Sequence, residues 1–430
     1  MDLSASWQTS PRRMIRDVLL VARGTVIGQA PFVLVTPLIT RLFPATELGI
    51  YGVALAFIGI AAPVAGLRFE LAVISARNEQ DVRPLAQLAA LAALPVTLVS
   101  VAILGALKSA SVGPYGALTW PLVLMSGATI AAAGLYSTLR CWLARVAQFR
   151  LIASSLTLQG CLRAAVPVLL APVSAGAGLL LSAELAARVS SLALMLRGRL
   201  RGAAALKLRI DWLALRGRLR SYWKYPLLLT PSALIDAAAT MLPVPVLASF
   251  YGLEAAGKFA LVQRLILLPA ALIVGSVGDV FHAHAVQVAA ARAGGVGAFL
   301  AGTARRLLLL ALLVYLPVAL VAPFVGRWLF GEQWSDAGSM MALLVPLCIA
   351  QTTVSPISRG LLLSGREERK LVADVVCLVL PMAALSAARS HSLLVAIGSF
   401  SAAATLAYAV YYLIIAQALK SSRAALASEQ

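Results

Sequence analysis

The residues best suited to chemistry are the few ionisable side chains that lie inside long apolar stretches. A charged side chain within a bilayer carries a cost of at least a few kcal/mol, so each is a candidate for function. Guanidinium groups bind phosphate through paired hydrogen bonds, so Arg23, Arg163 and Arg264 predict a cationic cavity for an anionic ligand, most simply a diphosphate. Gln263, beside Arg264, is a further candidate for the lining of this cavity.

Structural roles compete with these functional ones. Arg23 lies early in its apolar stretch, where its side chain can also reach the lipid headgroups. Glu184 and Arg188 lie four residues apart, which predicts a structural ion pair on one helix face. Asp236 fits three roles: a counter-ion to a buried arginine, a proton or sodium coupling site, or a polar residue in a helix interface.

Signatures of other chemistries are missing from the sequence. There is no GxxxxGK[ST] phosphate loop, no HExxH and no GxSxG turn. The four cysteines have no CxxC spacing, and His282 and His284 have no further ligand in register. We therefore expect no metal site, no cofactor and no enzymatic activity.

The composition places the chain in a membrane. With 61% hydrophobic and 12% charged residues, it has too little polar surface for a soluble globule of 430 residues. A spanning helix needs about 20 apolar residues, and we identify about twelve such stretches, which predicts an all-α polytopic membrane protein. The predicted spans are residues 17–40, 46–67, 84–107, 117–139, 150–171, 174–196, 226–249, 255–280, 307–327, 338–360, 371–388 and 392–418.

The net charge of +19 reports membrane topology rather than nucleic-acid binding. Basic residues concentrate in alternate loops and near both ends of the sequence, whereas each intervening loop holds at most one. This pattern predicts an even number of spans with both termini in the cytoplasm. The charged loops contain Arg77, Arg83, Arg140, Arg145, Arg150, a run at 197–224, Arg292, Arg305, Arg306, Arg366, Arg369 and Lys370.

A motif occurs twice, 208 residues apart. This offset pairs Gly49 with Gly257 and Gly52 with Ala260, and it matches Arg264 with an alanine at position 56. Such duplication predicts two related bundles of six helices. We expect an N-terminal lobe at 1–200, a basic linker at 201–224 and a C-terminal lobe at 225–430. The linker fits either a short amphipathic helix on an anionic membrane surface or a solvated segment.

Four segments, taken together and in order, resemble one family. Leu-Arg-Phe-Glu-Leu-Ala-Val-Ile at 67–74 resembles an LRYE-A-I signature, and residues 142–149 resemble a W-x-x-R-x-x-x-F link. Tyr-Pro at 225–226 resembles F-P, and residues 257–265 followed by Pro269 resemble a G-x-Y/F-x-x-x-x-R pattern. These are features of the Wzx-type oligosaccharide flippases, in the multidrug, oligosaccharidyl-lipid and polysaccharide exporter superfamily.

The resemblance implies a MATE-like fold of two pseudo-symmetric lobes around a central cavity that opens alternately to each side. It implies a substrate of undecaprenyl-diphosphate-linked oligosaccharide, carried from the cytoplasmic to the periplasmic leaflet of the bacterial inner membrane for surface polysaccharide synthesis. Membrane lipids, a polysaccharide polymerase and a chain-length regulator would be partners. Arg264 would contact phosphate, whereas Arg68, Glu70, Trp142 and Arg145 would serve gating or structure.

Two other functions fit parts of the sequence. A cation-coupled multidrug or small-molecule antiporter would share the fold, but a cavity rich in arginine should repel organic cations. A membrane enzyme of polysaccharide assembly would need a cluster of catalytic residues, and none is visible in the sequence. The flippase is therefore the function that the sequence favours.

Overall fold

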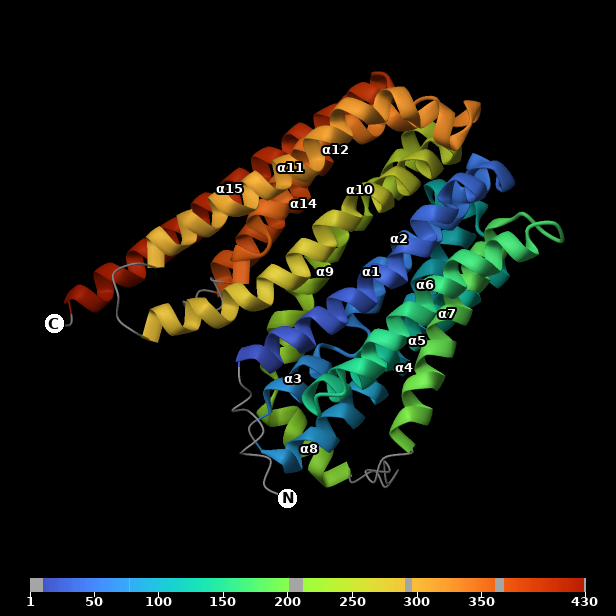
Figure 1. Cartoon of the computed structure of the whole chain (residues 1–430). Helices are drawn as coiled ribbons and strands as arrows, with labels where there is room; N and C mark the ends of the chain where they lie inside the picture. The colour runs from blue at the N-terminus through green and yellow to red at the C-terminus, as the bar shows by residue number, and fades with distance from the viewer. Residues whose placement is uncertain (1–10, 77, 201–211, 291–295, 360–366, 429–430) are drawn as a thin grey trace.

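A computed structural model describes residues 11–76, 78–200, 212–290, 296–359 and 367–428. Across these residues the protein is helical and contains no strand. The helices form two bundles that lie side by side, with α1 and α2 of the first bundle next to α10 of the second (Figure 1).

The first bundle alternates long spanning helices with short turns. Trp120 and Pro121 start one span, and Pro172 and Gly176 fall in the turn that separates the two spans at 149–200. The helices are α1 (Pro11–Leu42), α2 (Ala45–Ala61), the 3₁₀ turn η2 (Ala62–Val64), α3 (Phe69–Ser75), α4 (Glu79–Ser109), the 3₁₀ turn η3 (Gly113–Ala117), α5 (Trp120–Arg145), α6 (Phe149–Leu170) and α7 (Ala177–Leu200).

The second bundle follows a short basic helix, α8 (Trp212–Ser221), which shows that part of the linker predicted at 201–224 is helical. Residues 201–211 of that linker lie outside the described part of the chain. The remaining elements are the π-helical turn η4 (Tyr225–Leu229), α9 (Thr230–Met241), α10 (Pro243–Ala290), α11 (Val296–Phe330), η5 (Glu332–Trp334), α12 (Ala337–Val354), η6 (Ile357–Arg359), α14 (Glu367–Ala387), η7 (Ala388–Ser390) and α15 (Leu393–Ser428).

These helices confirm the predicted spans. Ten helical segments in the described residues are long and apolar enough to cross a membrane. One of them, Tyr225–Ala270, holds two passes, because Gly252 has φ 85° and breaks the helix there. The helix α1 adds a further pass through its apolar part, Val26–Leu42, so the chain crosses the membrane about twelve times.

The repeated motif joins the two bundles. Gly49 of α2 and Gly257 of α10 bring the two backbones into contact: a Cβ on Gly257 would overlap the carbonyl oxygen of Ala45, and a Cβ on Gly49 would overlap that of Leu253. Ala45 and Leu253 are themselves matched by the offset of 208, so the contact is symmetric. Small residues allow such close helix packing in a membrane.

A second contact at this end depends on a proline. Pro44 has no N–H group, so the carbonyl oxygen of Thr40, four residues earlier, has no helical donor. Two side chains of η5, in the other bundle, donate to it instead: Gln333 Nε2 at 2.7 Å and Trp334 Nε1 at 3.1 Å. We call this the closed end, formed by residues 40–49 and 251–257 together with η5.

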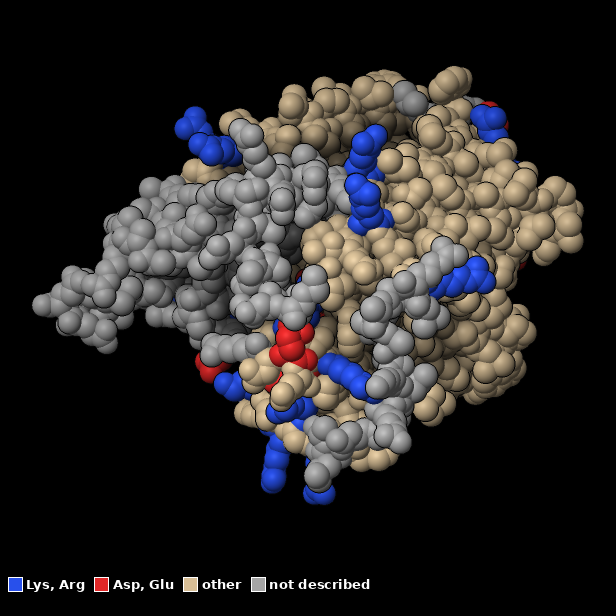
Figure 2. Space-filling model, turned by 60° about the horizontal axis from the view of Figure 1, so that its bottom comes forward, with Lys and Arg blue, Asp and Glu red and all other residues tan. Residues whose placement is uncertain are grey.

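The two bundles diverge from the closed end toward the opposite end, which carries α3 and α8 (Figure 1). We call this the open end. Lys and Arg side chains stand out around this face (Figure 2), and the exposed ones include Arg140, Arg150, Arg216, Arg220 and Lys224. The helix α8 is held here on α4, because Asp81 pairs with Arg218 at 2.8 Å and accepts a hydrogen bond from Tyr222 at 3.0 Å.

Replacing Gly257 by alanine tests the packing at the closed end. The added Cβ overlaps backbone that cannot move alone, so we expect a loss of about 1–3 kcal/mol in stability. Thermal unfolding of the purified protein measures it. Gly178→Ala is the matched control, because no heavy atom lies within 4 Å of its Cβ. Equal melting temperatures for the two variants would contradict the proposed contact.

Candidate functional site

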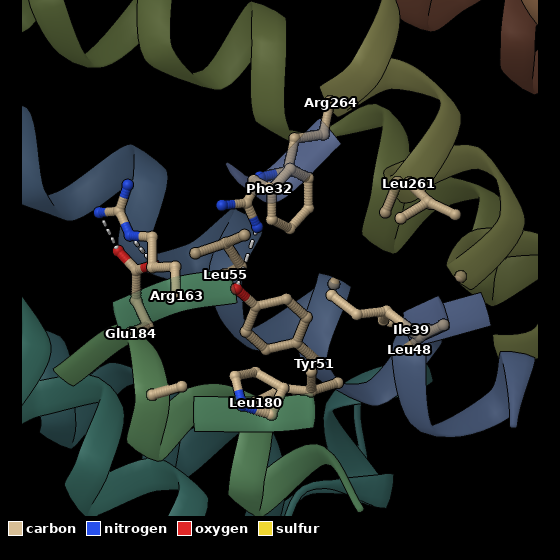
Figure 3. Close-up of a pocket in the computed structure, with 15 residues that line it drawn as sticks. Phe32, Ile39, Leu48, Tyr51, Leu55, Arg163, Leu180, Glu184, Leu261 and Arg264 are labelled. Atoms are coloured by element: carbon tan, nitrogen blue, oxygen red, sulfur yellow. Dashed lines mark hydrogen bonds and ion pairs between the residues drawn. The ribbon is translucent and has the colours of Figure 1, made fainter. Parts of the chain in front are cut away.

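A pocket of about 550 Å³, its opening to solvent included, lies between the bundles, on the closed-end side of the molecule. It is lined by helices α1, α2, α6, α7 and α10, and its polar side chains are Tyr51, Arg163, Glu184 and Arg264 (Figure 3). The remaining wall is mostly apolar, with Phe32 and several aliphatic residues. Two of the three arginines predicted to form a cationic cavity therefore share one pocket.

Arg163 is held by the carboxylate of Glu184. Its Nη2 donates to Glu184 Oε1 at 2.7 Å, and its Nε lies 2.6 Å from Oε2. Arg188 Nε donates to the same carboxylate at 2.9 Å, which confirms the predicted pair between Glu184 and Arg188. Glu184 is buried. The guanidinium groups of Arg163 and Arg188 share its one carboxylate, so these three side chains together carry a net positive charge.

Arg264 has no carboxylate partner among the described residues. Its guanidinium lies 3.8 Å from the centre of the Phe32 ring, and Nη1 donates to the hydroxyl of Tyr51 at 3.2 Å (Figure 3). Both partners are uncharged and both belong to the first bundle. A guanidinium has five N–H donors, so most of its capacity remains available to an anion in this pocket.

The other two predicted substrate-binding residues lie elsewhere. Arg23 is exposed on α1 and lines neither this pocket nor the larger cavity described below. Gln263 lies on a different face of α10 from Arg264, and its Nε2 donates to the carbonyl oxygen of Thr240 at 3.0 Å. It lines the second cavity, so α10 forms a wall between the two spaces.

The second cavity encloses about 1600 Å³, including its opening, and lies mainly within the second bundle. Asp374 is its most connected side chain. Its Oδ2 pairs with Lys370 Nζ at 2.6 Å and accepts a hydrogen bond from Ser232 at 2.8 Å, while its Oδ1 lies 3.4 Å from the hydroxyl of Tyr411. This cluster is not among the predicted site residues, although the spacing of four between Lys370 and Asp374 indicates an ion pair on one helix face.

Asp236 also lines this cavity, on α9. Its carboxylate has no ion-pair or hydrogen-bond partner in the described part of the chain, and it is exposed to the cavity. Within the same described ranges, no group of three or more His, Cys, Asp or Glu side chains is placed to hold a metal ion. The cavity is thus lined by two acids, of which Asp374 is paired with Lys370 and Asp236 has no such partner in the described residues.

The four residues predicted to serve gating or structure gather around α3. Arg145 Nη1 donates to the carbonyl oxygens of Val73 and Ala76 at 3.0 and 2.9 Å, and its Nη2 pairs with Glu79 at 2.6 Å. Trp142 packs against the apolar cluster beneath α3. Glu70 is buried, and that burial raises the pKa of its carboxyl. Arg68 instead lines the second cavity.

Several solved structures share this fold. The lipid II flippase MurJ, in an inward-closed conformation, has a TM-score of 0.71 at 12% identity, over 94% of this chain and 87% of that one. An outward-facing multidrug resistance MATE family transporter of the MOP superfamily has a TM-score of 0.64 at 15% identity, over 94% and 96%. A MOP superfamily transporter from Pyrococcus furiosus, with a binding pocket of reversed polarity, has a TM-score of 0.63 at 14% identity, over 95% and 96%.

These likenesses establish the all-α, two-bundle fold of the MATE and MOP transporters. No curated protein matches the chain at the level of sequence. A family model described as polysaccharide biosynthesis protein matches residues 38–339, which is well over half of the chain. The protein is therefore a member of the polysaccharide biosynthesis protein family.

Proposed function

We propose that this protein is a flippase that carries undecaprenyl-diphosphate-linked oligosaccharide repeat units from the cytoplasmic to the periplasmic leaflet. Family membership and the transporter fold support a membrane flippase. The diphosphate is the part that hydrocarbon excludes most strongly, so the protein must compensate its charge, whereas the polyprenyl tail can stay in the lipid.

The observation that carries the proposal is the guanidinium of Arg264, which has no ion-pair partner among the described residues. It lies between the bundles, among Phe32 and Tyr51, with no acid in contact. Nearby, Arg163 and Arg188 outnumber Glu184, so the whole pocket favours an anion. An exporter of organic cations would need the opposite balance of charge here.

The orientation follows from the distribution of charge. Basic side chains surround the open end, so we place this end in the cytoplasm, in the inner membrane, with both termini on that side. The closed end then faces the periplasm. In this state the space between the diverging bundles can take up substrate from the cytoplasmic leaflet. Release of the substrate to the periplasmic side requires the contact between α2 and α10 to separate. A polysaccharide polymerase and a chain-length regulator would act on the released product.

Arg264→Ala tests the phosphate contact. Loss of charge-assisted hydrogen bonds to an anion should reduce translocation about 10- to 100-fold. In cells that depend on this protein, surface polysaccharide should fall and lipid-linked repeat units should accumulate on the cytoplasmic side. Arg306→Ala, an exposed arginine of α11, is the control. Normal export by Arg264→Ala at normal protein level would remove Arg264 from the site.

Asp236→Asn tests a coupling role for the unpaired acid. We infer that Asp236 exchanges a proton or sodium ion as the cavity opens to each side, because its carboxylate has no fixed partner. The variant should bind substrate normally but lose at least tenfold in gradient-driven translocation into proteoliposomes. Asp336→Asn, an exposed acid at the start of α12, is the control. A gradient response equal to that of the wild type would exclude this role.

Glu184→Gln tests whether Glu184 is structural. The change leaves two half-buried arginines without a counter-charge, and breaking a buried ion pair costs about 3–5 kcal/mol. A large drop in melting temperature is therefore expected. Glu254→Gln, which removes an exposed carboxylate from the pair with Lys258, should cost little. Similar melting temperatures for both variants would show that Glu184 does not hold the pocket together.

A further inference from the structure

The turn before α3 holds two successive residues in an unfavourable backbone conformation. Leu67 has φ 48° and Arg68 has φ 62°, in the left-handed region that residues with a Cβ rarely adopt. Neither is glycine, although Gly66 lies directly before them. Strain of this kind persists only where the surrounding structure fixes the chain, and it gathers at functional sites.

Both ends of α3 are fixed by their neighbours. Phe69, its first residue, is 2% exposed in the apolar core of the first bundle. At its other end, Arg145 holds the carbonyl oxygens of Val73 and Ala76, and the hydroxyl groups of Ser75 and Tyr225 lie 2.6 Å apart. Because α3 cannot shift, the turn that joins it to α2 adopts the strained conformation.

This conformation places the side chain of Arg68 in the cavity of the other bundle. The other described residues that line the cavity all lie beyond residue 235, so Arg68 is the contribution of the first bundle. Its nearest charged partner is Glu70, at 3.9 Å, which is too far for a hydrogen bond. The Arg68 side chain is 24% exposed, and the described residues place no acceptor within hydrogen-bond distance of its guanidinium.

We propose that Arg68 binds the diphosphate of the lipid-linked substrate when the substrate enters the second cavity from the open end. This assignment rests on the proposed function. A planar guanidinium can donate two parallel hydrogen bonds to a diphosphate, and this geometry distinguishes it from a simple positive charge. Lys370 is the other cation among the described residues that line this cavity, and it is already paired with Asp374 at 2.6 Å, so the diphosphate is expected against the wall that carries Arg68.

Arg68→Gly separates binding from folding. Glycine accepts the left-handed conformation, so the variant keeps the turn, relieves its strain and removes only the guanidinium. The full chain, purified in lipid nanodiscs, is titrated with farnesyl diphosphate, farnesyl monophosphate and inorganic diphosphate. We expect the wild type to prefer farnesyl diphosphate to both other probes, and Arg68→Gly to bind it at least tenfold more weakly without loss of thermal stability.

Three further variants complete the test. Arg68→Lys keeps the charge without the planar donor pair and should recover only part of the affinity, while Leu67→Gly relieves strain next to an intact Arg68 and should bind normally. Arg150→Ala, an exposed arginine of α6, should also bind normally. Unchanged farnesyl diphosphate affinity in Arg68→Gly would overturn the assignment to Arg68 alone. A wild type that does not prefer the diphosphate to the monophosphate would overturn the proposed substrate and this assignment with it.

Discussion

The backbone contact between Gly49 and Gly257 is the constraint on which the arrangement of the two bundles depends. Each glycine lets a carbonyl group of the partner helix approach where any Cβ would overlap it. Lipid gives helices little hydrophobic reason to associate, so close packing of this kind supplies much of the attraction. Because the contact lies at one end of the helices, it holds the bundles together there, and they diverge toward the other end (Figure 1).

The two halves share a frame but differ in charge. Gly49 and Gly257 are equivalent by sequence and meet in space, whereas Arg264 has Ala56 as its counterpart. The first bundle supplies the uncharged Phe32 and Tyr51 against which Arg264 rests. A movement of one bundle against the other would therefore change the contacts of Arg264 with Phe32 and Tyr51. Such a change suits the proposed role, in which the site must release its ligand.

Most of the fold could be predicted from the sequence. The length of the apolar stretches and the positions of the basic residues are local features of the sequence, and the repeated motif is a periodic one. The pair Glu184 and Arg188 was also predictable, since its spacing alone brings the side chains together. Arg163 joins that pair from another helix, and no pattern in the sequence indicates such a contact. Arg23 matched its predicted companions in residue type, but its position on α1 leaves it on the surface.

The residues that line the second cavity could not be predicted from the sequence. Lys370 and Asp374 lie at the edge of a span, so they did not stand out as intramembrane charges, yet the fold turns them into the cavity. The conformation of Arg68 follows from how tightly α3 is held at both ends, which depends on residues as distant in sequence as Arg145 and Tyr225. Strain imposed by tertiary packing leaves no local signature.

The most direct test of the account is a reversible lock across the closed end. Gly52 and Ala260 are another pair of equivalent positions, and a Cβ on the glycine would lie 3.0 Å from that of the alanine. A disulfide needs a Cβ–Cβ distance of about 3.5–4.5 Å, so a small separation of the two helices accommodates the bridge. With Cys141, Cys161, Cys348 and Cys377 replaced by alanine, Gly52→Cys and Ala260→Cys are oxidised in proteoliposomes that carry a polyprenyl-diphosphate-linked oligosaccharide. We expect translocation to stop on oxidation and to resume on reduction. Translocation at the same rate with the crosslink intact would contradict this expectation.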